Sequence, residues 1–313
     1  MTMNNKSFFG TLFQSRKGRL SGPFSDKIFG FFNSLFLLLM FIIALYPIVY
    51  VLSASISDPA MVGTGKMLLW PVGVTWEGYK SLLSYKDLWV GYGNTVFYTV
   101  CGTILNLLAT LPCAYALSRK DFKPRNKVMV FFLFTMFFGG GMIPGYLNFR
   151  DLGLVNTRFY ILIHGLISVS NMIVCRTFFS NSIPWEMQEA AMLDGATDFG
   201  LFTTIILPLS KPIIAVMAIY YGVGHWNAYF DALVYLNDEN LKPMSLVLRE
   251  ILITMTNTSD AAAIIDSADV ERQRSAESMK YAVIIVSTAP VLCLYPFLQK
   301  HFAKGVMLGA IKG

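Results

Sequence analysis

Apolar residues in this sequence occur in six runs of about 20 positions, rather than in the short alternating or helical patterns of a soluble core. A run of that length matches the roughly 30 Å thickness of the hydrocarbon region of a bilayer. The runs cover residues 31–53, 91–117, 128–146, 159–179, 213–236 and 281–298. The pattern therefore predicts an all-α integral membrane protein with six transmembrane helices.

Polar segments between the runs define the expected organisation of the chain. The longest of them, on the outer side, is expected to bind a partner, because long loops in compact proteins are usually functional. The expected segments are a leader at 1–30, a first transmembrane helix at 31–53, an extracytoplasmic loop at 54–90, a transmembrane core at 91–299 with a polar loop at 181–212 and an extracytoplasmic loop at 237–280, and a tail at 300–313.

Composition and charge support the membrane interpretation. The 313-residue chain is 55% hydrophobic and 14% charged, whereas soluble domains carry about 25% charged residues. Lys and Arg mark the cytoplasmic side of a membrane protein, and they cluster at 16–19 and at 119–127. Both termini are therefore predicted to be cytoplasmic. The net charge of +6 then reflects topology and contact with anionic membrane lipid, and no nucleic-acid partner is expected.

Polar residues inside the predicted spans are candidates for a translocation path. In the span 213–236 they recur at i, i+4, i+7 and i+11, which places them on one helical face, and aromatic residues flank that face. Amide, carboxylate and aromatic groups suit hydrogen bonding to hydroxyls and stacking on sugar rings. The candidate path residues are Tyr220, Gly224, Trp226, Asn227, Tyr229 and Asp231, with Asn171 from the span 159–179.

Two further polar stripes occur in other spans. One contains His164, Ser168, Asn171 and Cys175, and the other contains Thr99, Thr103, Asn106 and Thr110. Such residues often do no more than join helices by hydrogen bonds, each worth about 0.6 kcal/mol. We favour this structural interpretation for the second stripe, and both interpretations stay open for the span 213–236.

Catalysis is not predicted. The three histidines are far apart, and no metalloprotease, nucleophile-elbow or nucleotide-binding motif is present. We therefore expect no catalytic residue, cofactor-binding residue or metal ligand on this chain. Asp231 allows a second hypothesis, a proton-coupled secondary transporter, although such carriers usually have further charged residues in their spans. A membrane scaffold without transport activity is a third.

The polar loop at 181–212 has clear local signals. Helix propensity extends from Trp185 to Leu193, and Gly195 is suited to end that helix. Thr197 or Asp198 can cap a second helix that continues to about residue 206. Acidic residues outnumber basic ones in the loop, so anionic lipid would repel it. A protein partner is the favoured surface.

The same loop resembles the EAA loop of bacterial ABC importer permeases, whose pattern is EAA-x3-G-x9-I-x-LP. The matching positions are Glu189, Ala190, Ala191, Gly195, Ile205, Leu207 and Pro208. The segments WNAYFDAL and FAKGVMLGAIKG are similar to the carbohydrate-uptake branch, specifically to the maltose-type second permease subunit. The segment FFGGGMIPGYLNFRDLGLVNT is similar to the subgroup for oligosaccharides or polysaccharide fragments.

This resemblance implies a permease subunit in a bacterial plasma membrane, not an enzyme. It implies a second, distinct permease subunit, two cytoplasmic ATPase subunits that hold ATP and magnesium, and an extracytoplasmic solute-binding protein. It further implies that a helix pair in the loop couples to the ATPases, and that the partner permease holds most of the sugar site. The coupling residues would be Glu189, Ala190, Ala191, Asp194, Gly195, Leu207 and Pro208.

Overall fold

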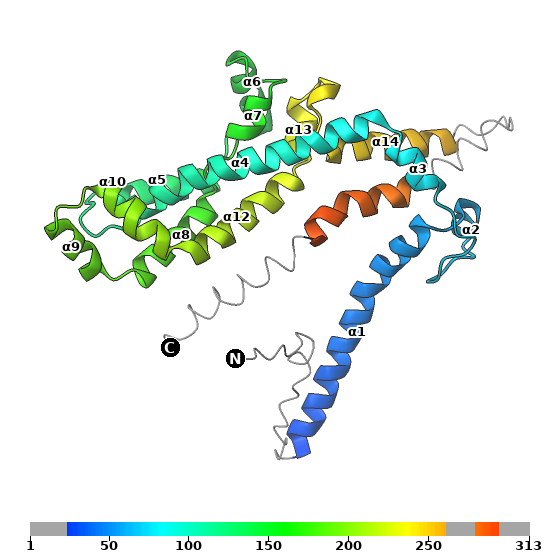
Figure 1. Ribbon diagram of the computed structural model, residues 1–313, viewed down its shortest axis with the longest axis horizontal. Helices are drawn as coiled ribbons and strands as arrows, with labels where there is room; N and C mark the ends of the chain where they lie inside the picture. Colours follow the sequence, from blue (N-terminus) through cyan, green and yellow to red (C-terminus); the bar gives the residue numbers. More distant parts are fainter. Residues whose placement is uncertain (1–23, 261–278, 294–313) are drawn as a thin grey trace, which may run out of the picture.

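The computed structural model describes residues 24–260 and 279–293, and all regular elements in these two ranges are helices (Figure 1). The prediction of an all-α protein is confirmed. Most of the leader, part of the 237–280 loop and the 300–313 tail lie outside the described residues. The longer helices are α1 (Phe24–Ser55), α4 (Lys86–Ser118), α5 (Arg125–Phe137), α6 (Met142–Asp151), α8 (Val169–Ser182), α9 (Trp185–Leu193), α12 (Lys211–Trp226), α14 (Met244–Asp260) and the helix Met279–Cys293.

Short elements connect these helices. Most are single turns that redirect the chain between longer helices (Figure 1). They are α2 (Pro59–Gly63), α3 (Glu77–Leu83), α7 (Arg158–Ile163), α10 (Asp198–Leu201), the π-helix η1 (Phe202–Ile206), α11 (Leu207–Leu209), α13 (Phe230–Tyr235) and the 3-10 helix η2 (Glu239–Leu241).

Helix α4 is the centre of the packing. It lies along α12 and α8 and also contacts α14 near its N-terminal end (Figure 1). Gly102 allows α12 to come close, because a Cβ atom at this position would lie 2.5 Å from His225 Nε2. Small residues permit such close approach between helices in membranes, where packing itself drives association.

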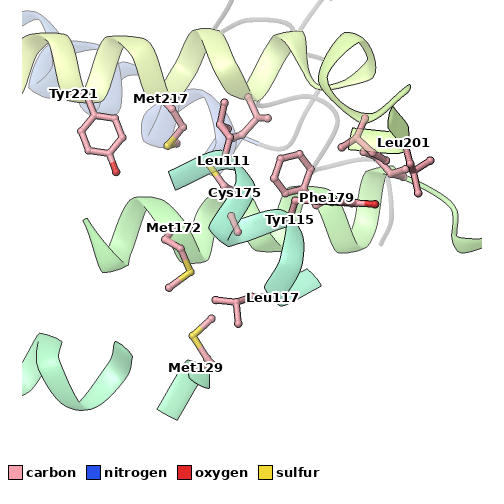
Figure 2. Packing of buried hydrophobic residues seen from close by; sticks show 14 of the residues in the cluster. Leu111, Tyr115, Leu117, Met129, Met172, Cys175, Phe179, Leu201, Met217 and Tyr221 are labelled. Carbon is pink, nitrogen blue, oxygen red and sulfur yellow. The ribbon is translucent and has the colours of Figure 1, made fainter. Parts of the chain in front are cut away.

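The largest core cluster joins α4, α8, α12 and the 181–212 loop. Figure 2 shows Tyr115 and Phe179 packed beside Leu201, with Met172 and Met217 nearby. The Tyr115 and Phe179 rings meet edge to face with centroids 6.0 Å apart, a favoured aromatic geometry. The loop is therefore part of the folded core on one side.

The predicted spans differ in continuity. Two helices, Asp26–Ser55 and Lys86–Ser118, are long and apolar enough to cross a membrane, and they match the first two predicted spans. In the third, α5 and α6 meet at 110° around Gly141, whose φ of 83° is easily reached only by glycine. The six spans and the orientation stay predictions, because the described residues contain two such helices, or four if each bent helix pair counts as one span.

The predicted spans 159–179 and 213–236 are not continuous helices, contrary to the expectation. The first breaks between α7 and α8, where Gly165 has a φ of 69°. The second breaks between α12 and α13, at residues 227–229. In membrane proteins, non-helical backbone is tolerated where protein covers it or where it lines a cavity. These breaks are thus candidates for a functional site.

Helix α1 stands apart from the other helices (Figure 1), and none of its most apolar window is buried. Large apolar side chains such as Phe31, Phe36 and Phe41 are all more than half exposed. A helix that is apolar all round is suited to lipid or to another membrane chain.

We expect Gly102→Ala to destabilise the protein, because the added methyl group overlaps the His225 ring and overpacking costs about 1–3 kcal/mol. Gly93→Ala is the matched control on the same helix, since a Cβ there meets nothing within 4 Å. Thermal unfolding of the purified protein in detergent measures both changes. Equal unfolding midpoints for the two variants would show that the α4–α12 approach is looser than described.

Candidate functional site

A cavity of about 250 Å³ lies where the two broken spans meet α4. Its walls come from α4, from the segment between α7 and α8, from α12 and from α13. Four of the predicted path residues line it, namely Asn171, Tyr220, Gly224 and Asp231. Polar atoms from helices distant in sequence thus surround one space, as expected for a solute path.

Asn106 of α4 organises one wall of the cavity. Its side-chain amide donates hydrogen bonds to the backbone carbonyls of Gly165, at 3.2 Å, and of Leu166, at 2.8 Å. Its carbonyl oxygen Oδ1 lies 2.6 Å from His225 Nε2, so His225 donates through Nε2. The break between α7 and α8 is therefore fastened to α4 and α12 by one nearly fully buried amide.

A second polar contact lies one turn along α4. The Tyr221 hydroxyl is 2.7 Å from Thr110 Oγ1 and accepts a hydrogen bond from the Ser168 backbone N–H at 3.2 Å. Ser168 is also the N-cap of α8. Three helices are consequently joined at one phenolic oxygen, and the break before α8 keeps its backbone groups satisfied.

An ionisable pair, His164 and Asp231, also lines the cavity. His164 Nδ1 is 3.3 Å from Asp231 Oδ2, and both side chains are about half exposed. His164 follows α7 and Asp231 belongs to α13, so the pair connects the two broken spans.

Three predicted path residues lie elsewhere. Trp226 and Asn227 line a separate cavity of about 260 Å³ beside α14 and the helix Met279–Cys293, where Trp226 Nε1 donates to the Ser287 carbonyl at 3.2 Å. Tyr229 packs in the aromatic cluster around Tyr235. The single-face prediction assumed a continuous helix, and the chain leaves that helix at Asn227.

Several cavity residues were not among the predicted path residues. Asn106 belongs to the stripe for which a structural role was favoured, His164 belongs to the other stripe, and Tyr221 was not a candidate. The useful signal was the matching i, i+4 pairs Asn106 with Thr110 and Tyr221 with His225, which meet across the α4–α12 contact. Two such pairs at equal spacing indicate facing helices.

The 181–212 loop has the predicted cornered shape. Helix α9 spans Trp185–Leu193 as predicted, and Gly195 adopts a φ of 83°. The Ala196 N–H reaches back to the Ala191 carbonyl at 3.0 Å, in the manner of a glycine helix cap. Thr197 caps α10 by accepting from the Gly200 N–H at 3.1 Å. The following π-helix and α11 meet α12 at 82°.

The predicted coupling residues divide between two faces of this loop. Ala191 is buried in the core, and Leu207 packs against it. Glu189 is exposed and accepts a hydrogen bond from Trp185 Nε1 at 2.5 Å. The remaining members, Ala190, Asp194, Gly195 and Pro208, are also exposed.

Two large apolar side chains of the loop are strongly exposed. Leu193 is 90% and Phe199 is 77% exposed. They lie at the end of α9 and in α10, on either side of the Gly195 corner. Exposed apolar groups beside acidic ones are typical of a protein-binding surface.

Comparisons with known proteins agree with this geometry. Residues 88–308 match the family model described as "Binding-protein-dependent transport system inner membrane component". The chain therefore belongs to this family. Membership means that it is a permease subunit of an ABC importer in a membrane, working with a partner permease, ATPase subunits and a binding protein.

Individual relatives cover nearly the whole chain. Protein LplC of Bacillus subtilis is 37% identical over 92% of this chain and 96% of its own length. The polygalacturonan/rhamnogalacturonan transport system permease YtcP of the same organism is also 37% identical, over 89% and 96%. A chain of a solved bacterial ABC transporter that imports the acidic polysaccharide alginate is 36% identical, with a TM-score of 0.81 over 90% of this chain and 99% of that one.

These findings confirm two predictions, a permease subunit rather than an enzyme and a location in the membrane. They do not support the proton-coupled carrier. Within residues 24–260 and 279–293, no group of three or more His, Cys, Asp or Glu could hold a metal ion.

We expect Asn106→Ala to loosen the segment between α7 and α8, because two carbonyls and His225 lose their partner. Each unsatisfied buried group costs about 1–3 kcal/mol. Hydrogen exchange should therefore rise in peptides covering residues 164–168. Asn227→Ala is the control, since its amide bonds only to its own helix, at the Val223 carbonyl. Unchanged exchange in Asn106→Ala would contradict the assigned anchoring.

Proposed function

We propose that this chain forms one half of the translocation path of an importer for oligosaccharides or polysaccharide fragments. The support for this substrate class is the likeness to a polygalacturonan/rhamnogalacturonan permease and to an alginate importer chain over most of their lengths. The cavity adds chemical support, because hydroxyl, amide and imidazole groups alternate around it with tyrosine rings. Such groups recognise sugar hydroxyls and the apolar faces of sugar rings.

The proposed assembly places this chain beside a second, distinct permease subunit in a bacterial plasma membrane. Both termini are cytoplasmic, and the chain crosses the membrane six times. Two ATPase subunits bind ATP and magnesium on the cytoplasmic side, and a solute-binding protein delivers sugar outside. Helix α1 has little contact with the rest of this subunit, since none of its most apolar window is buried. Its exposed surface is therefore suited to contact lipid or a neighbouring chain.

The observation that carries the coupling proposal is the exposed rim of the 181–212 loop. Leu193, Phe199 and Glu189 are exposed, while Ala191 and Leu201 fix the loop to the core. A rigidly held loop with an apolar and acidic tip is suited to dock in a cleft of another protein. We assign that cleft to an ATPase subunit, with Glu189, Ala190, Asp194, Gly195 and Pro208 at the contact.

The path residues have distinct proposed roles. Tyr220 provides an aromatic face, and Asn171 and Asp231 provide hydrogen-bonding groups in the same cavity. Gly224 borders the open space of the cavity, since a Cβ atom there would meet nothing within 4 Å. Trp226 and Tyr229 support the break between α12 and α13 from outside the cavity, and Asn227 also lies outside the cavity.

We expect Glu189→Lys and Gly195→Pro to reduce sugar uptake at least tenfold and to lower co-purification of the ATPase subunits, while insertion of the permease into the membrane is retained. The first change reverses the charge at the docking tip, and the second disrupts the corner, because proline cannot adopt the positive φ of Gly195.

Glu77→Lys is the control, because it makes the same charge reversal on α3, away from the loop. It should keep the ATPase subunits bound. Normal uptake by both loop variants would overturn the proposed docking role.

We expect Tyr220→Ala to raise the sugar concentration needed for half-maximal uptake about tenfold, which corresponds to about 1.4 kcal/mol of lost contact. Assembly with the ATPases should be unchanged. Asn227→Ala is the control, since Asn227 is the C-cap residue of the same helix and lies outside this cavity. Uptake by complexes in proteoliposomes, over a range of sugar concentrations, measures both variants, and identical curves would argue against a sugar contact at Tyr220.

A further inference from the structure

Arg119 lies at the junction between α4 and the 181–212 loop. It is the C-cap residue of α4 and is only 8% exposed. Among residues 26–253 and 279–293 it is the one Asp, Glu, Lys or Arg that is buried. Burying a charge costs free energy unless it is paired and hydrogen-bonded, so its surroundings have to compensate.

All five N–H donors of the Arg119 guanidinium have acceptors. Asp121 receives two hydrogen bonds, from Nε at 2.9 Å and from NH2. NH1 donates to Asp198 at 2.7 Å and to the Tyr115 hydroxyl at 3.2 Å, and NH2 reaches the Met192 sulfur at 3.6 Å. The contacted residues come from α4, the α4–α5 connection, α9 and α10.

The charge state of this cluster is fixed at neutral pH. The hydrogen bonds from Arg119 lower the pKa of the Asp121 carboxyl below its ordinary value. The same hydrogen bonds raise the pKa of the guanidinium above its ordinary value. Both groups are therefore fully ionised.

Tyr115 extends the junction deeper into the loop. Its hydroxyl lies 3.4 Å from Gln188 Oε1 on α9, and its ring stacks on Phe202 of η1 with centroids 5.2 Å apart. The end of α4 thus contacts three successive elements of the loop, through one guanidinium and one phenol.

Stability alone does not account for the Asp198 contact. The Asp198 side chain is 82% exposed, and ion pairs open to solvent contribute about 0–1 kcal/mol. Asp121 already provides a two-bond carboxylate for Arg119. The hydrogen bond to Asp198 instead joins α10 to the C-terminal end of α4 in a fixed geometry.

Helix α4 leads from this link to the cavity. Thr110 and Asn106, which bond to Tyr221 and His225, lie on the same helix, and Asn106 is about 20 Å from Arg119 at 1.5 Å per residue. Helix α4 is continuous from Lys86 to Ser118, with Pro112 between Arg119 and these two contacts, so displacement at its C-terminal end can be carried along the helix to the cavity.

We propose that Arg119 is a positioning residue that transmits movement of α10 to α4, and so couples events at the 181–212 loop to the cavity. The inference rests on the proposed function, in which the loop docks on the ATPase subunits. Tyr115 transmits movement of α9 and η1 to α4 in the same way, through its contacts with Gln188 and Phe202.

Two matched variants separate transmission from stability. Asp121→Asn and Asp198→Asn each remove one carboxylate from the same guanidinium and leave the other in place. Asp121 accepts two bonds and is the less exposed of the two carboxylates, so Asp121→Asn should lower the unfolding midpoint more. Asp198→Asn should lower the amount of sugar transported per ATP hydrolysed by about fivefold, which is more than Asp121→Asn should lower it.

The measurement uses the complete importer in proteoliposomes, with its binding protein loaded with an oligosaccharide that it transports. Uptake, ATP hydrolysis and thermal unfolding are measured for each variant. Arg119→Lys, which keeps the charge but has three donors in place of five, should also uncouple hydrolysis from uptake. Lys123→Ala, an exposed position in the same connection, should match the unmodified complex in all three.

Two results would overturn the inference. One is unchanged transport per ATP in Asp198→Asn, and the other is a loss of coupling that simply follows the loss of stability across the variants. Failure of the proposed function looks different, because Glu189→Lys would then keep both the ATPase subunits and uptake. Loss of docking in Glu189→Lys together with full coupling in Asp198→Asn would reject the role of Arg119 alone.

Discussion

The structure depends on one constraint, which is that the buried amides of α4 and the hydroxyls of Thr95 and Thr110 are paired with neighbouring segments, whereas the Oγ1 atoms of Thr99 and Thr103 have no hydrogen-bond partner. Near its N-terminal end, Asn94 donates to the carbonyls of Asn240 and Lys242 at 2.7 and 3.1 Å, and Thr95 accepts from the Met244 N–H at 2.8 Å. In the middle, Asn106 and Thr110 engage α12 and the break before α8. The segment from η2 to α14, helix α12 and the break before α8 are therefore each held against α4 by a specific hydrogen bond, and not by apolar contact alone.

This constraint explains why the cavity lies at broken helices. Backbone groups released by a break need partners, and side chains from α4 and α12 supply them at Gly165, Leu166 and Ser168. The same breaks expose polar groups toward a common space. The interrupted helices thus release backbone groups that need partners, and they also place polar groups around the cavity.

Sequence patterns predicted what is local in this chain. Helix α9 and its glycine corner were predictable because propensity, a cap residue and a positive φ are encoded within a few positions around Gly195. The family was predictable from the spacing of Glu189, Gly195 and Pro208. The break at Asn227 was not predictable, because apolar residues continue on both sides of it, and only the structure shows that Trp226 and Asp231 line different cavities. From the sequence, Arg119 was interpreted only as one of the basic residues that mark the cytoplasmic side, because its partner Asp198 lies 79 positions away.

The π-helix at Phe202–Ile206 gives the motif spacing a geometric meaning. Leu201 and Ile206, five positions apart, are both fully buried, although residues five apart in an α-helix point well away from each other. The wider π turn returns Ile206 to the side of Leu201. If the same residues wound as an ordinary α-helix, α11 would be rotated by about 100° about the helix axis relative to α10. The wide turn within the motif therefore sets how the start of α12 is oriented relative to the Gly195 corner.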